Sequence, residues 1–194
     1  MYLQEDEEKG DNRFDILTER LMKSRTIIIA DVVTKHLAQK VITQLLLLEQ
    51  ENPKEDIRMF INSPGGDADA GFAIYDMMQF IKPRVKSVCA GVTASAAVII
   101  LLGSKKEDRF SLPNSRILIH QPSTGVHGTA SDIQIEASEI IKCREKINNL
   151  IAVETGQKVE KVENDTKRNY WMSAEESVDY GLVSKIIKSN EDIN

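Results

Sequence analysis

The chain has 194 residues, of which 41% are hydrophobic, and a formal net charge of −5 at pH 7. This size suits one well-packed domain, predicted over residues 1–194 with a flexible acidic arm at 1–13. The negative charge and scattered basic residues argue against nucleic acid as a partner, and no apolar run approaches the roughly 18 residues of a membrane span. The polar N-terminus is unlike a signal peptide, and the two cysteines, Cys89 and Cys143, make no disulfide framework. These features predict a cytoplasmic protein with no membrane partner.

Apolar residues alternate between strand-like and helix-like spacing along the chain, which predicts an α/β fold with a parallel sheet. A short amphipathic helix is expected around Phe14 to Met22. The strands predicted after it lie at 26–30, 56–61, 84–90, 110–112, 116–121 and 182–187. The predicted helices lie at 34–50, 69–81, 95–102 and 131–154, with two short helices before the last strand. Strand, turn and helix occur twice in succession, as a weak internal repeat.

The helix predicted at 131–154 has an apolar stripe that is long for a domain of this size to cover. The stripe consists of Ile133, Ala137, Ile140, Ile141, Ile147, Leu150 and Ile151. One interpretation is that the helix packs along its own sheet. The other is that it projects into the interface of a symmetric oligomer.

Two strand-to-helix junctions carry the residues that indicate chemistry. One is the turn Ser63-Pro64-Gly65-Gly66, and the other places Ser95 at the start of a helix. A helix N-terminus offers unpaired backbone N–H groups and the positive end of the helix dipole. Adjacent glycines let further N–H groups approach a substrate. Together these parts suit a nucleophile with an oxyanion hole, although an ordinary N-cap serine and a plain tight turn remain alternatives.

A candidate general base, His120, ends the strand predicted before Gln121-Pro122. At that position its side chain can face a cleft, although an isolated histidine is more often structural. His36 and His127 have no supporting motif and are interpreted as structural. The cysteines, the methionines and Trp171 are interpreted as core residues.

Five sequence strings, in this order and spacing, resemble the proteolytic subunit of the Clp ATP-dependent protease, the ClpP family. They are FINSPGG, GFAIYD, Gly91-x-x-Ala94-Ser95, LPNSRILIHQP and the series TGQ, DT, MSAEES and YGLV, and they span about residues 20–187. The resemblance implies a ClpP/crotonase-type spiral of β-β-α units with a projecting handle helix. It also implies stacked heptameric rings, fed with unfolded protein by a hexameric Clp ATPase.

Position by position, the resemblance implies that Ser95 is the nucleophile, His120 the general base, and the N–H groups of Gly66 and Ala96 the oxyanion hole. No cofactor or metal is implied. The chain also lacks the phosphate-binding loop that ATP hydrolysis would need.

The third triad position departs from the family pattern, because Asn169 stands where the family has an aspartate. An asparagine oxygen can orient His120, but it carries no charge to stabilise the imidazolium. The resemblance therefore predicts weak intrinsic catalysis. Asp165, one helical turn upstream, is a less favoured substitute.

Further departures affect assembly and substrate binding. Lys167 precedes Arg168 where the family has an acid, so ring-to-ring salt bridges would be replaced by repulsion across a homotypic interface. The usual Gly-rich, substrate-aligning strand is replaced by Ser123-Thr124-Gly125. The acidic arm also lacks the usual start of the axial loops, which disfavours unaided ATPase docking.

Three functions remain open. The first is a serine endopeptidase subunit of Clp type that degrades unfolded polypeptides to short peptides. The second is a weakly active or regulatory subunit that works only in a hetero-oligomer with a ClpP paralogue, which Asn169 and Lys167 favour. The third is a crotonase-like acyl-CoA enzyme, against which the segment Pro113–Pro122 argues.

Overall fold

The structure, a computed structural model, describes residues 17–193, and residues 17–23 form a helix at the place expected for the short amphipathic one. The predicted arm at 1–13 and Phe14 lie outside the described residues. Within the described part of the chain, no helix combines the length and apolarity needed to cross a bilayer.

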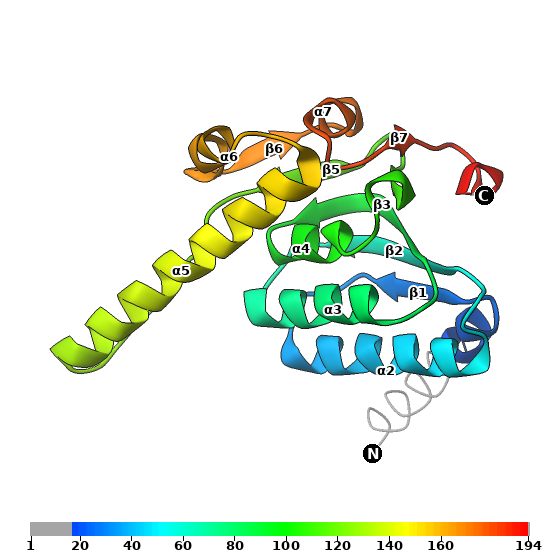
Figure 1. Cartoon of the computed structure of the whole chain (residues 1–194), viewed down its shortest axis with the longest axis horizontal. Helices are drawn as coiled ribbons and strands as arrows, with labels where there is room; N and C mark the ends of the chain where they lie inside the picture. Colours follow the sequence, from blue (N-terminus) through cyan, green and yellow to red (C-terminus); the bar gives the residue numbers. More distant parts are fainter. Residues whose placement is uncertain (1–16, 194) are drawn as a thin grey trace, which may run out of the picture.

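A mixed sheet of seven strands forms the centre of the molecule (Figure 1). Five of the strands are hydrogen-bonded in the order β1-β2-β3-β4-β7. The C-terminal part of β3 also pairs with β5, and β5 pairs with β6. Every pair is parallel except β5 with β6. The strands are β1 (Thr26–Ile29), β2 (Ile57–Ser63), β3 (Val85–Ala94), β4 (Arg109–Ser111), β5 (Arg116–Ile119), β6 (Tyr170–Met172) and β7 (Lys185–Ile186).

Helices cover the sheet and close the fold. They are α2 (Lys35–Glu51), α3 (Ala68–Phe80), α4 (Ala96–Leu102), α5 (Ala130–Thr155), α6 (Val159–Thr166) and α7 (Ala174–Tyr180), with short 3₁₀ turns at Lys106–Asp108 and Asn190–Ile193. The main core lies between β1 to β3 and helices α2, α3 and α4, and every residue of α4 is buried. This arrangement confirms the predicted α/β class.

Three strands differ from the sequence-based prediction. The last, β7, spans only Lys185–Ile186, whereas a strand was predicted over 182–187. β3 runs on to Ala94, through the segment expected to be the turn before α4. β6 was not predicted, and it pairs antiparallel with β5. On β6, the side chain of Trp171 is 44% exposed with Arg116 stacked over its ring at 4.7 Å, so its interpretation as a core residue was wrong.

Helix α5 projects from the body of the molecule, as the second interpretation of its stripe predicted (Figure 1). Its buried residues all lie near its C-terminal end, between Ile147 and Thr155. In the other half, Ile133, Ile135 and Ile141 are exposed. The apolar stripe is therefore longer than the surface that residues 17–193 provide for it.

A buried ion pair fixes the base of α5. The guanidinium of Arg109, fully buried at the start of β4, is paired with the carboxylate of Glu154 and also donates to the carbonyls of Ser104 and Glu154. The hydroxyl of Tyr75 lies 3.4 Å from Glu154, and burial with this carboxylate nearby raises the pKa of Tyr75. Losing one partner of such a pair is costly because the other charge stays buried.

We expect Glu154→Ala to lower the free energy of unfolding by about 3 kcal/mol, because Arg109 would keep its charge without a counter-ion. Urea denaturation would measure the change. As the control, Glu139→Ala removes an exposed pair with Lys142 and should cost less than about 1 kcal/mol. Equal losses in the two variants would contradict this account of the helix base.

Candidate active site

Ser95 occupies a strained turn between the end of β3 and the start of α4. Its φ of 55° and ψ of −122° lie in a region that non-glycine residues rarely adopt. The backbone is held there because the Ser95 N–H donates to the carbonyl of Leu118 at 2.9 Å. Its side chain makes no capping hydrogen bond to the helix, so the hydroxyl is not used as an N-cap.

An irregularity in the sheet precedes this turn. Ile61 pairs with Cys89 and Ser63 pairs with Thr93, so two steps along β2 match four steps along β3. The extra length includes Gly91, whose φ of +117° accommodates the bend beside the Asn62 side chain. Such bulges redirect the end of a strand, and here that end leads into Ser95.

The Gly65-Gly66 turn lies directly against this serine. A Cβ on Gly65 would lie 2.4 Å from the carbonyl oxygen of Ala94 and 2.7 Å from the Cβ of Ser95. Across the same turn, the Val33 N–H donates to the Gly65 carbonyl at 2.9 Å. Only a residue without a side chain allows so close an approach.

The two N–H groups predicted to form an oxyanion hole make no backbone hydrogen bond within residues 17–193. Val33 forms backbone hydrogen bonds with Gly65 and with Asp67, the two neighbours of Gly66. Ala96 is the first residue of α4, whose N–H has no acceptor within the helix. Both groups remain available to an anionic oxygen.

His120 follows β5, and the pairing of β5 with β6 brings Asn169 opposite it. Ile119 pairs with Tyr170, so the next antiparallel step matches residue 120 with residue 169. His120 Nδ1 lies 3.1 Å from Asn169 Oδ1. If this ring nitrogen carries the proton, Nε2 retains the lone pair that a general base needs.

Ser95 and His120 both line one cavity of about 590 Å³. Gly66 and Ala96 also line it, as do Ser123 and Thr124, whereas the predicted substrate residue Gly125 does not. Its apolar wall consists of Val98, Ile99, Ile119, Ile147 and Ile151. From the sequence, Ile147 and Ile151 were predicted only as part of the apolar stripe of α5, because spacing alone does not distinguish a pocket wall from a core.

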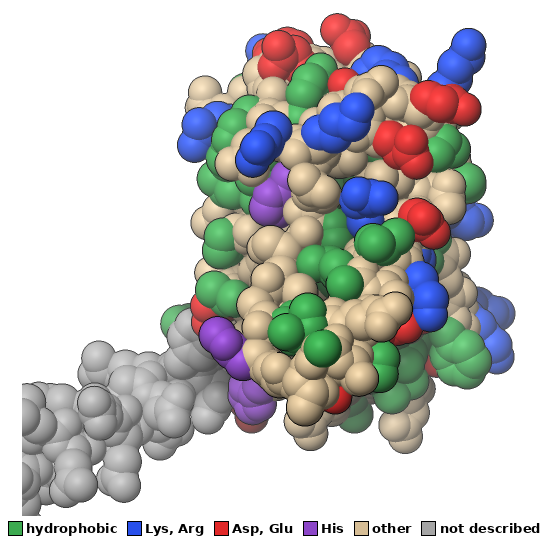
Figure 2. All heavy atoms as spheres, turned by 90° about the vertical axis from the view of Figure 1, so that its left-hand side faces the viewer, with side chains coloured by type: hydrophobic (Ala, Val, Ile, Leu, Met, Phe, Trp, Pro, Cys, Tyr) green, Lys and Arg blue, Asp and Glu red, His purple; other side chains and the backbone are tan. Residues whose placement is uncertain are grey.

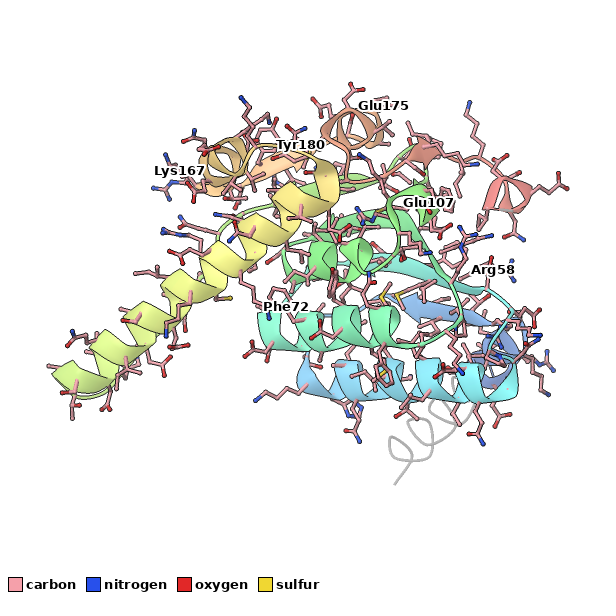
Figure 3. All side chains as sticks on the ribbon, in the orientation of Figure 1. Arg58, Phe72, Glu107, Lys167, Glu175 and Tyr180 are labelled. Carbon is pink, nitrogen blue, oxygen red and sulfur yellow. The ribbon has the colours of Figure 1, made fainter. Side chains whose placement is uncertain are left out.

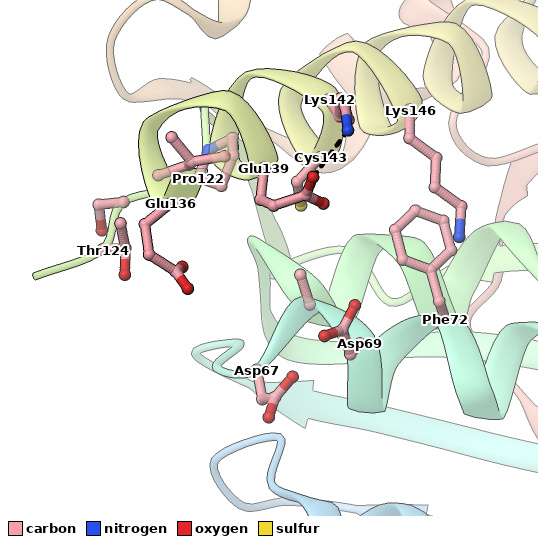
Figure 4. A pocket seen from close by; sticks show the side chains of 13 residues that line it. Asp67, Asp69, Phe72, Pro122, Thr124, Glu136, Glu139, Lys142, Cys143 and Lys146 are labelled. Carbon is pink, nitrogen blue, oxygen red and sulfur yellow. Dashed lines mark hydrogen bonds and ion pairs between the residues drawn. The ribbon is translucent and has the colours of Figure 1, made fainter. Parts of the chain in front are cut away.

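A second hollow of about 410 Å³ adjoins this cavity, since Asp67, Ala68, Pro122, Ser123 and Thr124 line both. Figure 4 shows it between α3 and α5, with an ion pair from Lys142 to Glu139 at 2.7 Å. The ammonium of Lys146 lies 3.6 Å from the centroid of the Phe72 ring at its far end. The candidate site therefore opens into a groove along α5 that both charged and apolar side chains line.

The side chains predicted for an oligomer interface lie at the end of α6. Lys167 is exposed, and its ammonium donates to Asn164 Oδ1 at 2.7 Å, while Arg168 is also exposed. Figure 3 shows Lys167 pointing away from the body of the molecule. In the side view of Figure 2, charged side chains gather at the top, at the level of α6 and α7, and the middle of the face carries few charges.

The possible substitute Asp165 is held elsewhere. Its carboxylate accepts from Lys161 at 2.6 Å and from the Tyr180 hydroxyl at 2.9 Å. Burial, with the hydrogen bond to Asp165, raises the pKa of Tyr180 and keeps its hydroxyl a donor. Asn169 is therefore the residue that meets His120.

Other residues offer no competing chemistry in residues 17–193. Burial raises the pKa of the Cys89 thiol to about 12, which leaves it protonated and unreactive. His36 and His127 are exposed and line no part of the Ser95 cavity. No group of three or more metal-ligating side chains occurs within this part of the chain.

We expect Gly65→Ala to abolish labelling of Ser95 by a fluorophosphonate probe, because the new Cβ would displace the Ser95 turn. Gly156→Ala is the matched control, since Gly156 also has a positive φ, of +79°, but has no atom within 4 Å of the added Cβ. Both changes carry backbone strain of about 1–2 kcal/mol. Labelling of Gly65→Ala at the rate of the control would show that this close contact does not support the site.

Comparisons with known proteins agree with this architecture. Residues 8–190 match the Clp protease family. The chain is 50% identical over 189 residues to the ATP-dependent Clp protease proteolytic subunit 2 of Treponema denticola, covering 97% of this chain and 94% of the relative. An Asn-to-Asp mutant of ClpP1 from Listeria monocytogenes has a similar solved structure, with a TM-score of 0.85, 47% identity and coverage of 92% of this chain and 99% of that one. The chain therefore belongs to the Clp protease family and has the ClpP fold.

Proposed function

We propose that this chain is a serine-type peptidase subunit that hydrolyses unfolded polypeptides to short peptides. The observation that carries the proposal is one cavity that contains Ser95, His120 and the unpaired N–H groups of Gly66 and Ala96. Membership of the Clp protease family supports it.

In the proposed reaction, Ser95 Oγ attacks the scissile carbonyl and its proton passes to His120 Nε2. The Gly66 and Ala96 N–H groups hold the oxygen that becomes negative, and His120 then gives the proton to the leaving amine. Water then attacks the acyl-enzyme, with His120 taking a proton from the water and returning it to Ser95 Oγ as the peptide is released. Within residues 17–193, the side chains of Ser95 and His120 are not hydrogen-bonded to each other. In many enzymes such a catalytic hydrogen bond forms only when substrate binds.

Asn169 makes this catalysis weak in our proposal. Its Oδ1 fixes the neutral tautomer of His120 but leaves the imidazolium without a nearby negative charge. In chymotrypsin-type proteases an Asp-to-Asn exchange at this position lowers kcat by about 10⁴-fold, or about 5.5 kcal/mol of barrier. Asp165 cannot compensate while Lys161 and Tyr180 hold it.

Substrate would run as an extended strand past Ser123, Thr124 and Gly125, with an apolar side chain against Ile147 and Ile151. These chains would assemble into heptameric rings that receive unfolded protein from a hexameric Clp ATPase. The exposed apolar half of α5 supports assembly, because it lacks a partner surface within residues 17–193.

The second candidate is a regulatory subunit that works in a hetero-oligomer with a ClpP paralogue. It is favoured by the uncharged Asn169 together with adjacent positive charges on Lys167 and Arg168. Two such pairs facing each other across a homotypic interface would repel, whereas an acidic partner would be attracted.

We expect Asn169→Asp to raise kcat for a short fluorogenic peptide by up to about 10⁴-fold, because the carboxylate would stabilise the His120 imidazolium. Ser95→Ala in the same background is the control and should remove the gain. An Asn169→Asp variant with wild-type mass and unchanged kcat would contradict the proposed role of this residue.

We expect the wild-type chain alone to form single rings or smaller species, and Lys167→Glu to shift it towards double rings by supplying an acid beside Arg168. Native mass spectrometry would measure both. Lys158→Glu makes the same charge change on the exposed N-cap residue of α6 and should have no such effect. A stable double ring of the wild-type chain would refute the repulsion.

A further inference from the structure

Asn148 is a polar residue in the buried part of α5, beside the pocket residue Ile147. It is 3% exposed. Burying an amide without a hydrogen bond is unfavourable, so such a residue needs a partner. Its Oδ1 lies 3.0 Å from the hydroxyl of Thr166, in a contact that joins α5 to the last residue of α6.

Thr166, which is 1% exposed, makes two kinds of contact. Its hydroxyl reaches Asn148 and also the Val162 carbonyl at 2.8 Å. Its own carbonyl accepts from the Gln121 N–H at 2.7 Å. The Gln121 side chain adds a bond of 2.9 Å to the carbonyl of Lys167. Thr166 therefore joins three segments of the chain.

Both members of the His120–Asn169 pair are attached next to this point. His120 immediately precedes Gln121, and Asn169 follows Thr166 by three residues. The segment between Thr166 and β6 has no helix or strand of its own to hold it. A movement of Thr166 would therefore change the positions of the imidazole and of the amide that orients it.

A small cavity lies beside the Asn148–Thr166 hydrogen bond, which we call the bridge, and leaves room for such a movement. Its volume is about 130 Å³, and it is lined by Gln121, Arg144, Asn148, Glu163, Thr166 and Lys167. Hydrogen bonds to Asn148 and from the Gln121 N–H help to fix the position of Thr166 relative to these segments.

We propose that Asn148 and Thr166 are positioning residues, through which α5 sets the geometry of the His120–Asn169 pair. The proposal rests on the proposed peptidase function. It gives α5, which also carries the pocket residues Ile147 and Ile151, a second role in that function. Neither Asn148 nor Thr166 lines the Ser95 cavity, so their effect would be indirect.

The test compares Thr166→Val, which keeps the shape and removes the hydroxyl, with Thr166→Ser, which keeps the hydroxyl. Thr155→Val is the matched control. Thr155 is also buried, and its hydroxyl donates to the carbonyl four residues earlier, that of Ile151, at 2.6 Å. The Thr155 hydroxyl bonds only with Ile151 and Gln157 among residues 17–193, so a general effect of losing a buried hydroxyl would appear in both valine variants.

Two readouts are measured on the assembled protein. The first is the labelling of Ser95 by a fluorophosphonate, separated into probe affinity and maximal rate. The second is acrylamide quenching of the fluorescence of Trp171, the single tryptophan of the chain, which lies on β6 two residues from Asn169. The second readout does not require catalysis.

We expect Thr166→Val to lower the maximal labelling rate on the order of tenfold with little change in affinity, and to change the quenching of Trp171. Thr166→Ser should restore both values, and Thr155→Val should alter neither. If Thr166→Val does not fold, Asn148→Leu removes the same bridge from the other side and should give the same two changes.

Wild-type values for Thr166→Val in both readouts would overturn the proposal, as would equal effects in Thr155→Val. If the wild-type chain is not labelled at Ser95, the peptidase function fails. In that case the quenching of Trp171 alone tests the role of the Asn148–Thr166 bridge, and unchanged quenching in Thr166→Val overturns that role.

Discussion

The candidate site depends on the short antiparallel pairing of β5 with β6. The rest of the sheet is parallel, and parallel strands with their crossover helices supply Ser95 and the glycine turn from one edge. Asn169 lies 49 positions after His120 in the chain, and the three residues of β6 bring it into register with His120. Without this pairing, His120 would have no hydrogen-bond partner to fix its tautomer. The residue that this pairing places against the His120 ring, Asn169, carries no charge.

The serine side of the site depends instead on close backbone contact. Ser95 keeps its strained φ because β3, the Leu118 carbonyl and the Gly65 turn hold it on three sides. The energy of this strain is offset by the buried core around α4, in which every helical residue is buried. Ser95 is therefore rigidly placed, whereas the His120–Asn169 pair lies nearer the surface and is attached through hydrogen bonds.

Much of this arrangement could be predicted from the sequence, because its signals are local. The helix predicted over 34–50 is found as α2 with Thr34 as its N-cap, and Gly181 ends α7 in the left-handed conformation. The strand β6 could not be predicted in this way, since three residues carry no period and their pairing partner is distant in sequence. For the same reason Trp171 was assigned to the core, although a cationic Arg116 covers its ring at the surface. Spacing also could not show that Asp165 is held by Lys161 and Tyr180, or that the Asn148 amide meets Thr166.

The most direct test of the account is to identify which residue a fluorophosphonate modifies, by mass spectrometry of the digested chain, and to time the reaction. The account predicts one adduct, on the peptide that contains Ser95, formed slowly in the wild-type chain and faster in Asn169→Asp. An adduct on another residue, or no adduct in either protein once assembled, would contradict the assignment of Ser95 as the nucleophile.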